Sequence, residues 1–114
     1  MSTSPVSQSG VYTGLLDELP VAKDATTSRT VVKNDVLSQV LFSFDAGQAL
    51  TEHASPKAVI VQILNGKMNF TVGGKTTLLQ TGDVIYLAPN DPHALEAVEP
   101  CHMALTMVNV NTND

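Results

Sequence analysis

The sequence predicts an all-β protein folded as one small antiparallel β-barrel, and three features carry this prediction. Short strand-like runs follow one another at regular spacing between residues 28 and 109. Glycine, asparagine and proline stand between these runs, where turns need a positive or a fixed φ. No segment keeps apolar residues at helical spacing for three turns. Many short strands joined by such turns are typical of a β-sandwich or β-barrel.

The length and composition indicate one globular domain. The chain has 114 residues, of which 43% are hydrophobic and 15% are charged. This composition is too apolar for a disordered protein, and a chain of this length makes one domain. The first residues are rich in serine, so we expect a flexible tail over residues 1–12 and a single barrel domain over residues 13–114.

The charge balance argues against two classes of partner. Six basic side chains face eleven acidic ones, which gives a net charge of −5. Neither a nucleic acid nor an anionic membrane surface is an expected partner, because both attract clustered Lys and Arg. No apolar stretch approaches the roughly 18 residues of a membrane helix. The single cysteine, Cys101, and a start without a basic and apolar leader predict a reduced, cytoplasmic protein.

The individual strands are expected where apolar or β-branched residues gather between turns. Residues 15–20 form one amphipathic turn that ends at Pro20, too short for a long helix. Residues 89–92 form a rigid loop directly before His93. The expected strands cover residues 28–32, 36–44, 48–55, 58–64, 67–72, 75–79, 84–88 and 101–109.

Two glycine-containing pairs predict tight connections in the middle of the chain. Asn65-Gly66 follows an almost continuous apolar run and favours a two-residue hairpin, because both residue types tolerate positive φ. Gly73-Gly74 follows the alternating run 67–72 and predicts a second hairpin. The register of the neighbouring strands then decides which side chains point into the barrel.

Two segments resemble the two sequence motifs of the cupin family. In the first segment, Gly47, His53 and Gly66 fall on positions of the first cupin motif. In the second, Gly82 and His93 match the second motif. The resemblance covers roughly residues 36–108 and implies a double-stranded antiparallel β-helix, or jelly roll, like that of small single-domain RmlC-like cupins with a conserved barrel. It also implies that His53 and His93 meet inside the barrel.

The departures from these motifs bear on metal binding. In metal-binding cupins, two histidines and a glutamate of the first motif and the histidine of the second hold one divalent ion. Ser55 stands at the second histidine position and Val59 at the glutamate position. Ala88 and Asn90 replace the usual proline and glycine of the second motif. The resemblance therefore implies a reduced metal site with two of its four ligands.

A divalent ion such as Zn, Ni, Fe or Mn is the cofactor that the two histidines could hold. Zinc usually takes three or four protein ligands, so two imidazoles predict a weaker site than a full one. His102 is a candidate third ligand. However, strand alternation places Cys101 and Met103 on the more apolar, inward face, which turns His102 outward.

The interior is expected to form a pocket for a small molecule. Its predicted lining consists of Ser55, Val59, Val61, Met68, Phe70 and Tyr86. A metal-free binding or sensing module is the alternative to metal binding, and the two histidines could also be a buried, hydrogen-bonded pair without a ligand. The family includes dioxygenases, isomerases and decarboxylases, so the resemblance selects no reaction.

Self-association is a further expectation that is compatible with each of these functions. Small cupins commonly pair through a sheet face and an exchanged N-terminal strand, so the resemblance implies a homodimer. Residues 30–33 are the candidate exchanged strand, and an outer row with Ile60 and Leu64 would need covering.

Overall fold

Nine strands and one short helix make up the part of the chain that the structure, a computed structural model, describes, residues 5–110. The helix is α1 (Leu15–Glu18). The strands are β1 (Thr26–Lys33), β2 (Leu37–Phe44), β3 (Ala49–His53), β4 (Ala58–Asn65), β5 (Lys67–Val72), β6 (Lys75–Gln80), β7 (Val84–Leu87), β8 (His93–Ala97) and β9 (Cys101–Val108).

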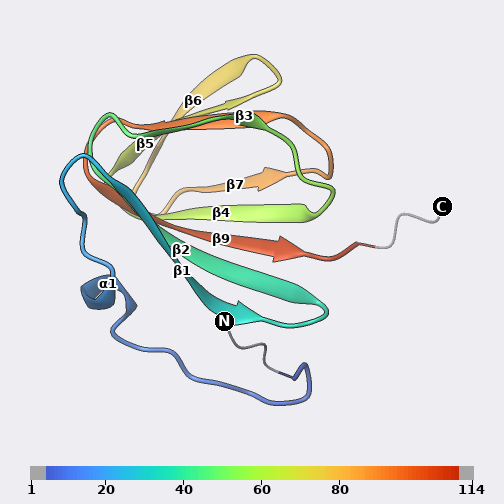
Figure 1. Ribbon diagram of the computed structural model, residues 1–114. Coiled ribbons are helices and arrows are strands. Elements are labelled where there is room, and N and C mark those ends of the chain that lie inside the picture. Colours follow the sequence, from blue (N-terminus) through green and yellow to red (C-terminus); the bar gives the residue numbers. More distant parts are fainter. Residues whose placement is uncertain (1–4, 111–114) are drawn as a thin grey trace.

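The strands form two antiparallel sheets that face each other (Figure 1). Sheet A has five strands in the order β1-β2-β9-β4-β7, and sheet B has four in the order β3-β8-β5-β6. The chain crosses repeatedly between the sheets, since β4 lies in sheet A and β5 in sheet B. The all-β, jelly-roll prediction is confirmed by this arrangement.

The core lies between the sheets and follows the period of two that strands impose. In β4, Val59, Val61 and Ile63 are at most 3% exposed, whereas Ile60 is 45% exposed. Met68 and Phe70 of β5 meet them from sheet B. Further core residues are Phe44, Leu79, Leu87, Leu95, Ala97, Cys101 and Met103.

Strand β8 is the one strand that the sequence did not predict. It begins directly after the loop 89–92, and its residues His93, Leu95 and Ala97 are buried. Ala94 and Glu96 lie between them, and alanine and glutamate are poorly represented in strands. Its formation depends on its neighbours β3 and β5 rather than on its own propensity.

The pair Asn65-Gly66 forms a corner between the two sheets, which corrects the prediction of a hairpin. Asn65 ends β4 in sheet A, and β5 begins one residue beyond Gly66 in sheet B. Of these two residues, only Gly66 has a positive φ, of 89°. A Cβ atom there would lie 2.4 Å from Cβ of Cys101 and 2.5 Å from the carbonyl oxygen of Pro100. Glycine is required here by this close approach as well as by its φ.

The second predicted hairpin is confirmed. Gly73 and Gly74 have φ values of 58° and 79°, and they connect β5 to β6 within sheet B. Positive φ at both central residues gives the turn a twist that matches its flanking strands.

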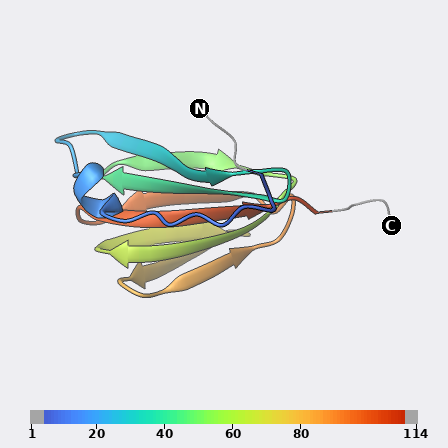
Figure 2. The same cartoon turned by 90° about the horizontal axis from the view of Figure 1, so that it is seen from below.

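The N-terminal segment crosses the outer face of sheet A, the face that points away from sheet B (Figure 2). Glu18 of α1 forms an ion pair with Arg29 of β1. The carbonyl oxygen of Leu19 accepts a hydrogen bond from Nε2 of His102, at 2.7 Å. Of the predicted tail, residues 1–4 lie outside the described residues, while Tyr12 borders a pocket on sheet A. Across residues 5–110, no helix has the length and apolar character that a membrane span requires.

Two edge strands are interrupted by bulges. The register of β1 against β2 shifts between Thr30 and Val32, and that of β3 against β8 shifts between Leu50 and His53. Residues 30–33, which were predicted to be exchanged between two copies of the chain, lie in β1 and pair with β2 of the same chain.

Replacing Gly66 tests the corner, and Gly74 provides a matched control. We expect Gly74→Ala to lower the free energy of unfolding by about 1 kcal/mol, because its φ of 79° strains alanine while open space surrounds the new methyl group. Gly66→Ala adds a clash with strand β9 and should cost about 3 kcal/mol. Urea denaturation of both variants measures the difference, and equal losses would contradict the close approach at Gly66.

Candidate ligand-binding site at the histidine pair

His53 and His93 meet at one end of sheet B, although they lie 40 positions apart in the sequence. His53 is the last residue of β3, and His93 is the first residue of β8. The two residues are Cα partners in the antiparallel ladder. Their ring centroids lie 4.4 Å apart, and the ring planes are inclined at 63°. The sequence therefore predicted correctly that these two imidazoles come together.

The two histidines differ in their exposure to solvent. His93 is 5% exposed, as predicted for an interior residue. His53 is exposed, which corrects the prediction that both rings lie in the interior. The bulge between Leu50 and His53 explains this difference, because an irregular register breaks the simple alternation on which the prediction was based. The pair forms a solvent-open site with one ring buried and one ring at the surface.

Hydrogen bonds to the backbone set the tautomer of both rings. Nδ1 of His53 donates to the carbonyl oxygen of Thr51 at 2.8 Å. Nδ1 of His93 donates to the carbonyl oxygen of Asp91 at 3.1 Å. Because a carbonyl oxygen only accepts, the proton of each neutral ring lies on Nδ1 and the lone pair lies on Nε2. This is the state in which histidine binds a metal ion or accepts a hydrogen bond.

The free nitrogen of His93 is within reach of solvent. In residues 5–110, Nε2 of neither His53 nor His93 has a hydrogen-bond partner. The same residues contain no buried side-chain nitrogen or oxygen that lacks a partner. Nε2 of His93 must therefore keep some contact with solvent. The ring of Phe70 supports His93 from inside the barrel, with centroids 6.1 Å apart and planes inclined at 27°.

The other two motif positions contribute little to a metal site. Val59 is 3% exposed and belongs to the core, and its side chain has no donor atom. The Ser55 hydroxyl accepts a hydrogen bond from the backbone N–H of Lys57 at 3.2 Å. Within the described part of the chain, no group of three or more His, Cys, Asp and Glu side chains could hold a metal ion.

His102 lies outside this site, on the outer face of sheet A. Strand alternation predicted its outward direction correctly, and the N-terminal segment then buries it to 8% exposure. Nε2 donates to Leu19, and Nδ1 lies 3.1 Å from Oδ1 of Asn65. Both ring nitrogens are thus engaged within the chain, which corrects the suggestion that His102 could be a third metal ligand.

The predicted pocket residues divide into two groups. Val61, Met68 and Phe70 lie in the core together with Val59, on the inward faces of β4 and β5. Tyr86 is 61% exposed and pairs with Ile60 on the outer face of sheet A. Its place in β7 corrects its prediction as a pocket residue, because the inward positions of this strand are Ile85 and Leu87.

Asn90 organises the loop that leads to His93. Its φ of 70° lies in the left-handed region, where asparagine is the best tolerated residue after glycine. Its backbone N–H donates to the carbonyl oxygen of Ser55 at 2.7 Å, which ties the loop to the segment after His53. Sequence analysis identified Asn90 only as a departure from the second cupin motif. Its residue type could have indicated the left-handed conformation, because asparagine tolerates positive φ.

Cys101 does not take part in the site. Its side chain has no exposed surface, and burial together with the nearby Glu99 carboxylate raises the pKa of the thiol to about 11. The thiolate is the form that binds metals and attacks electrophiles, so this residue is chemically quiet at neutral pH.

Comparison with known proteins assigns the chain to a family within the cupin-type barrels. The family model "AraC-like ligand binding domain" matches residues 38–113, which is most of the chain. The chain belongs to this family. No protein with a curated description matches the sequence.

Solved structures share the fold. A conserved protein of unknown function from Streptococcus pyogenes is 32% identical, with a TM-score of 0.83 over 98% of both chains. A cupin 2 conserved barrel domain protein from Leptotrichia buccalis is 28% identical, with a TM-score of 0.78 over 82% of this chain and 45% of its own. A cupin superfamily protein from Desulfitobacterium hafniense is 20% identical, with a TM-score of 0.80 over 84% of this chain and 88% of its own. These likenesses agree with the jelly-roll architecture.

The reactivity of Cys101 should report its burial. We expect the native thiol to react with Ellman's reagent at pH 8 at least about 100-fold more slowly than the thiol of the unfolded chain, because a pKa of about 11 leaves little thiolate. Stopped-flow absorbance with and without guanidinium chloride measures both rates. Similar rates would show that solvent reaches Cys101.

Proposed function

We propose that this protein binds a small organic molecule at the His53–His93 pair, with a divalent transition-metal ion as part of the site. One observation carries the proposal: both Nδ1 atoms donate to backbone carbonyls, so that two neighbouring Nε2 lone pairs are directed away from the backbone. Membership in a ligand-binding family supports the small-molecule part. Zn, Ni, Fe and Mn are the ions to consider.

The residues present fit a weakly held ion with open positions. Two neutral imidazoles supply two ligands, and the rings lie close enough together to face one ion. Water or an oxygen atom of the bound molecule would fill the remaining positions, because Val59 offers no donor. When bound, the ion would polarise such an oxygen atom. His53 gives access from solvent, while Phe70 fixes the ring of His93.

A metal-free binding site is the second candidate. It is favoured by the absence, within residues 5–110, of a third acidic, cysteine or histidine side chain near the pair. In this case the two Nε2 atoms would accept hydrogen bonds from hydroxyl or amide groups of the ligand. The same tautomers serve both functions, so metal uptake distinguishes them.

Pairing of two chains and a cytoplasmic location stay predictions. An outer row of Ile60, Val84 and Tyr86, between 45% and 61% exposed, supports a contact between copies at the β4–β7 side of sheet A. Apolar side chains gathered on one face commonly mark an interface.

Metal titration of protein purified without a His-tag tests the first candidate. We expect weak, stoichiometric uptake of Co²⁺ or Ni²⁺, measured by visible absorption and calorimetry. His53→Gln and His93→Gln should each weaken binding at least about ten-fold, because each removes one of two imidazole ligands. His102→Gln is the matched control, and its metal affinity should equal that of the natural chain.

Three results would decide between the candidates. Uptake that depends on His53 and His93 supports the metal site. No uptake, combined with long-range ¹⁵N NMR spectra that show Nδ1-protonated rings, supports the metal-free site. Equal uptake by all three variants contradicts the assignment of the pair as ligands.

A further inference from the structure

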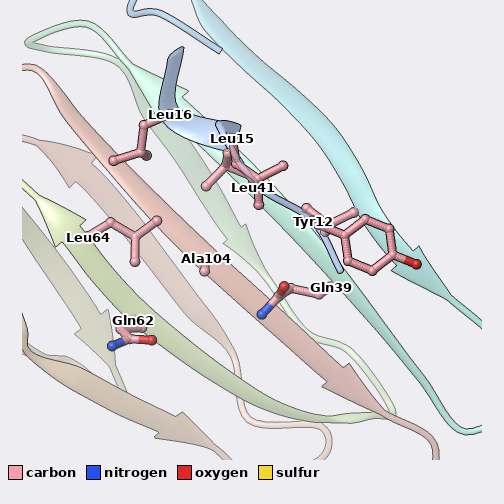
Figure 3. A pocket seen from close by; sticks show the side chains of 9 residues that line it. Tyr12, Leu15, Leu16, Gln39, Leu41, Gln62, Leu64 and Ala104 are labelled. Carbon is pink, nitrogen blue, oxygen red and sulfur yellow. The ribbon is translucent and has the colours of Figure 1, made fainter. Parts of the chain in front are cut away.

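The outer face of sheet A carries a pocket of about 310 Å³ that is separate from the histidine pair (Figure 3). The N-terminal segment covers it with Tyr12, Leu15 and Leu16. Its floor consists of outward-facing residues of β2, β9 and β4. The histidine pair lies in the other sheet, between β3 and β8. The motifs that led to the histidines do not include this pocket.

Ala104 makes the floor hollow. It stands between Leu41 and Gln62, which are its partners in β2 and β4. Its methyl group is the smallest side chain in this row, and Leu41 and Leu64 rise beside it as walls. A larger side chain at position 104 would occupy the space directly, and because it faces away from sheet B it would leave the core unchanged.

Two polar contacts hold the cover of the pocket in place. Helix α1 has only four residues and none of them is buried, so packing alone does not fix it. The Glu18–Arg29 ion pair ties it to β1. Directly after the helix, the carbonyl oxygen of Leu19 accepts the 2.7 Å hydrogen bond from the buried His102 ring. The cover is thus anchored to sheet A at two points, on β1 and on β9.

The lining of the pocket selects for an uncharged molecule. No Lys, Arg, Asp or Glu side chain lines it, and most of its residues are apolar. Two carboxamides provide polarity. The Gln39 amide donates to Oγ1 of Thr106 at 3.3 Å, which leaves its oxygen available. The side-chain amide of Gln62 forms no hydrogen bond with any of residues 5–110. This residue is exposed and lines the pocket. A charged ligand would lose hydration here without gaining an ionic partner.

We propose that this pocket is a second binding site, for a small, uncharged, largely apolar molecule with one hydrogen-bonding group. Its volume lies at the small end of the range for ligand pockets, about 300–1,000 Å³, which suits a compact molecule such as a fused-ring phenol. The apolar body lies over Ala104 beneath Leu15 and Leu16, and the polar group binds the side-chain amide of Gln62. A second copy of the chain is a less suitable occupant, because α1 stands above the hollow and shields it from a flat surface.

Two probes of equal ring size test the proposal on the complete protein. 2-Naphthol is uncharged and carries one hydroxyl group, whereas naphthalene-2-sulfonate carries a fixed negative charge. The sequence has no tryptophan, so the fluorescence of the probe is measured against a low protein background. We expect 2-naphthol to bind at least about ten-fold more tightly than the sulfonate, because only the sulfonate must lose the hydration of a charge. Amide shifts in ¹⁵N–¹H spectra should centre on Ala104, Leu64 and Leu16.

Matched variants locate the site. Ala104→Leu should weaken 2-naphthol binding at least about ten-fold, because it fills the floor of the pocket. Ala49→Leu makes the same change at an exposed position of β3 in the other sheet and should leave the affinity unchanged. Gln62→Leu, at an exposed position, should weaken 2-naphthol binding as well, because it removes the polar partner.

Four outcomes would overturn the proposal. These are equal binding of both probes, unchanged binding by Ala104→Leu, amide shifts that centre on His53 and His93, and a dimer that dissociates in Ala104→Leu. The last result would assign the hollow to a second copy of the chain. None of these outcomes depends on metal uptake at the histidine pair, so the two proposals stand or fall separately.

Discussion

The corner at Asn65 and Gly66 is the contact on which both proposed sites depend. Gly66 passes so close to Cys101 and Pro100 that no Cβ atom fits between them. Beside it, Oδ1 of Asn65 accepts the backbone N–H of His102 at 2.9 Å. These contacts fix strand β9 against the end of β4. Because β9 also pairs with β2, the corner sets the register across the centre of sheet A. A shift of one residue would exchange its inner and outer faces.

Each site is connected to this corner through strand pairing. On one side, β5 continues into sheet B and pairs Val72 with His93, and β8 then pairs His93 with His53. On the other side, Ala104 follows His102 by two residues and therefore shares its outward face. One tight contact thus places an imidazole pair in one sheet and an apolar hollow on the other.

The sequence predicted the features that depend on the alternation of side chains along a strand and on the residue types of turns. The inward direction of Val59, Val61, Met68 and Phe70 follows from a period of two, although these residues were expected to line a pocket and instead form the core. The hairpin at Gly73-Gly74 follows from its glycines. The exposure of His53 could not be predicted, because a bulge depends on how two distant strands pair. The outer pocket could not be predicted either. It requires the path of the N-terminal segment across β2, β4 and β9, three strands that come from separate parts of the chain.

The bulges in β1 and β3 also have a consequence for the protein in concentrated solution. Both strands lie at the edge of a sheet, where free N–H and C=O groups invite a further strand. A bulge breaks the straight row of these groups. The opposite edge of sheet A, β7, has only four residues, and the opposite edge of sheet B, β6, carries Lys75 at its start. Short, irregular or charged edges disfavour edge-to-edge aggregation. The architecture therefore protects the edges of both sheets against fibril-like growth.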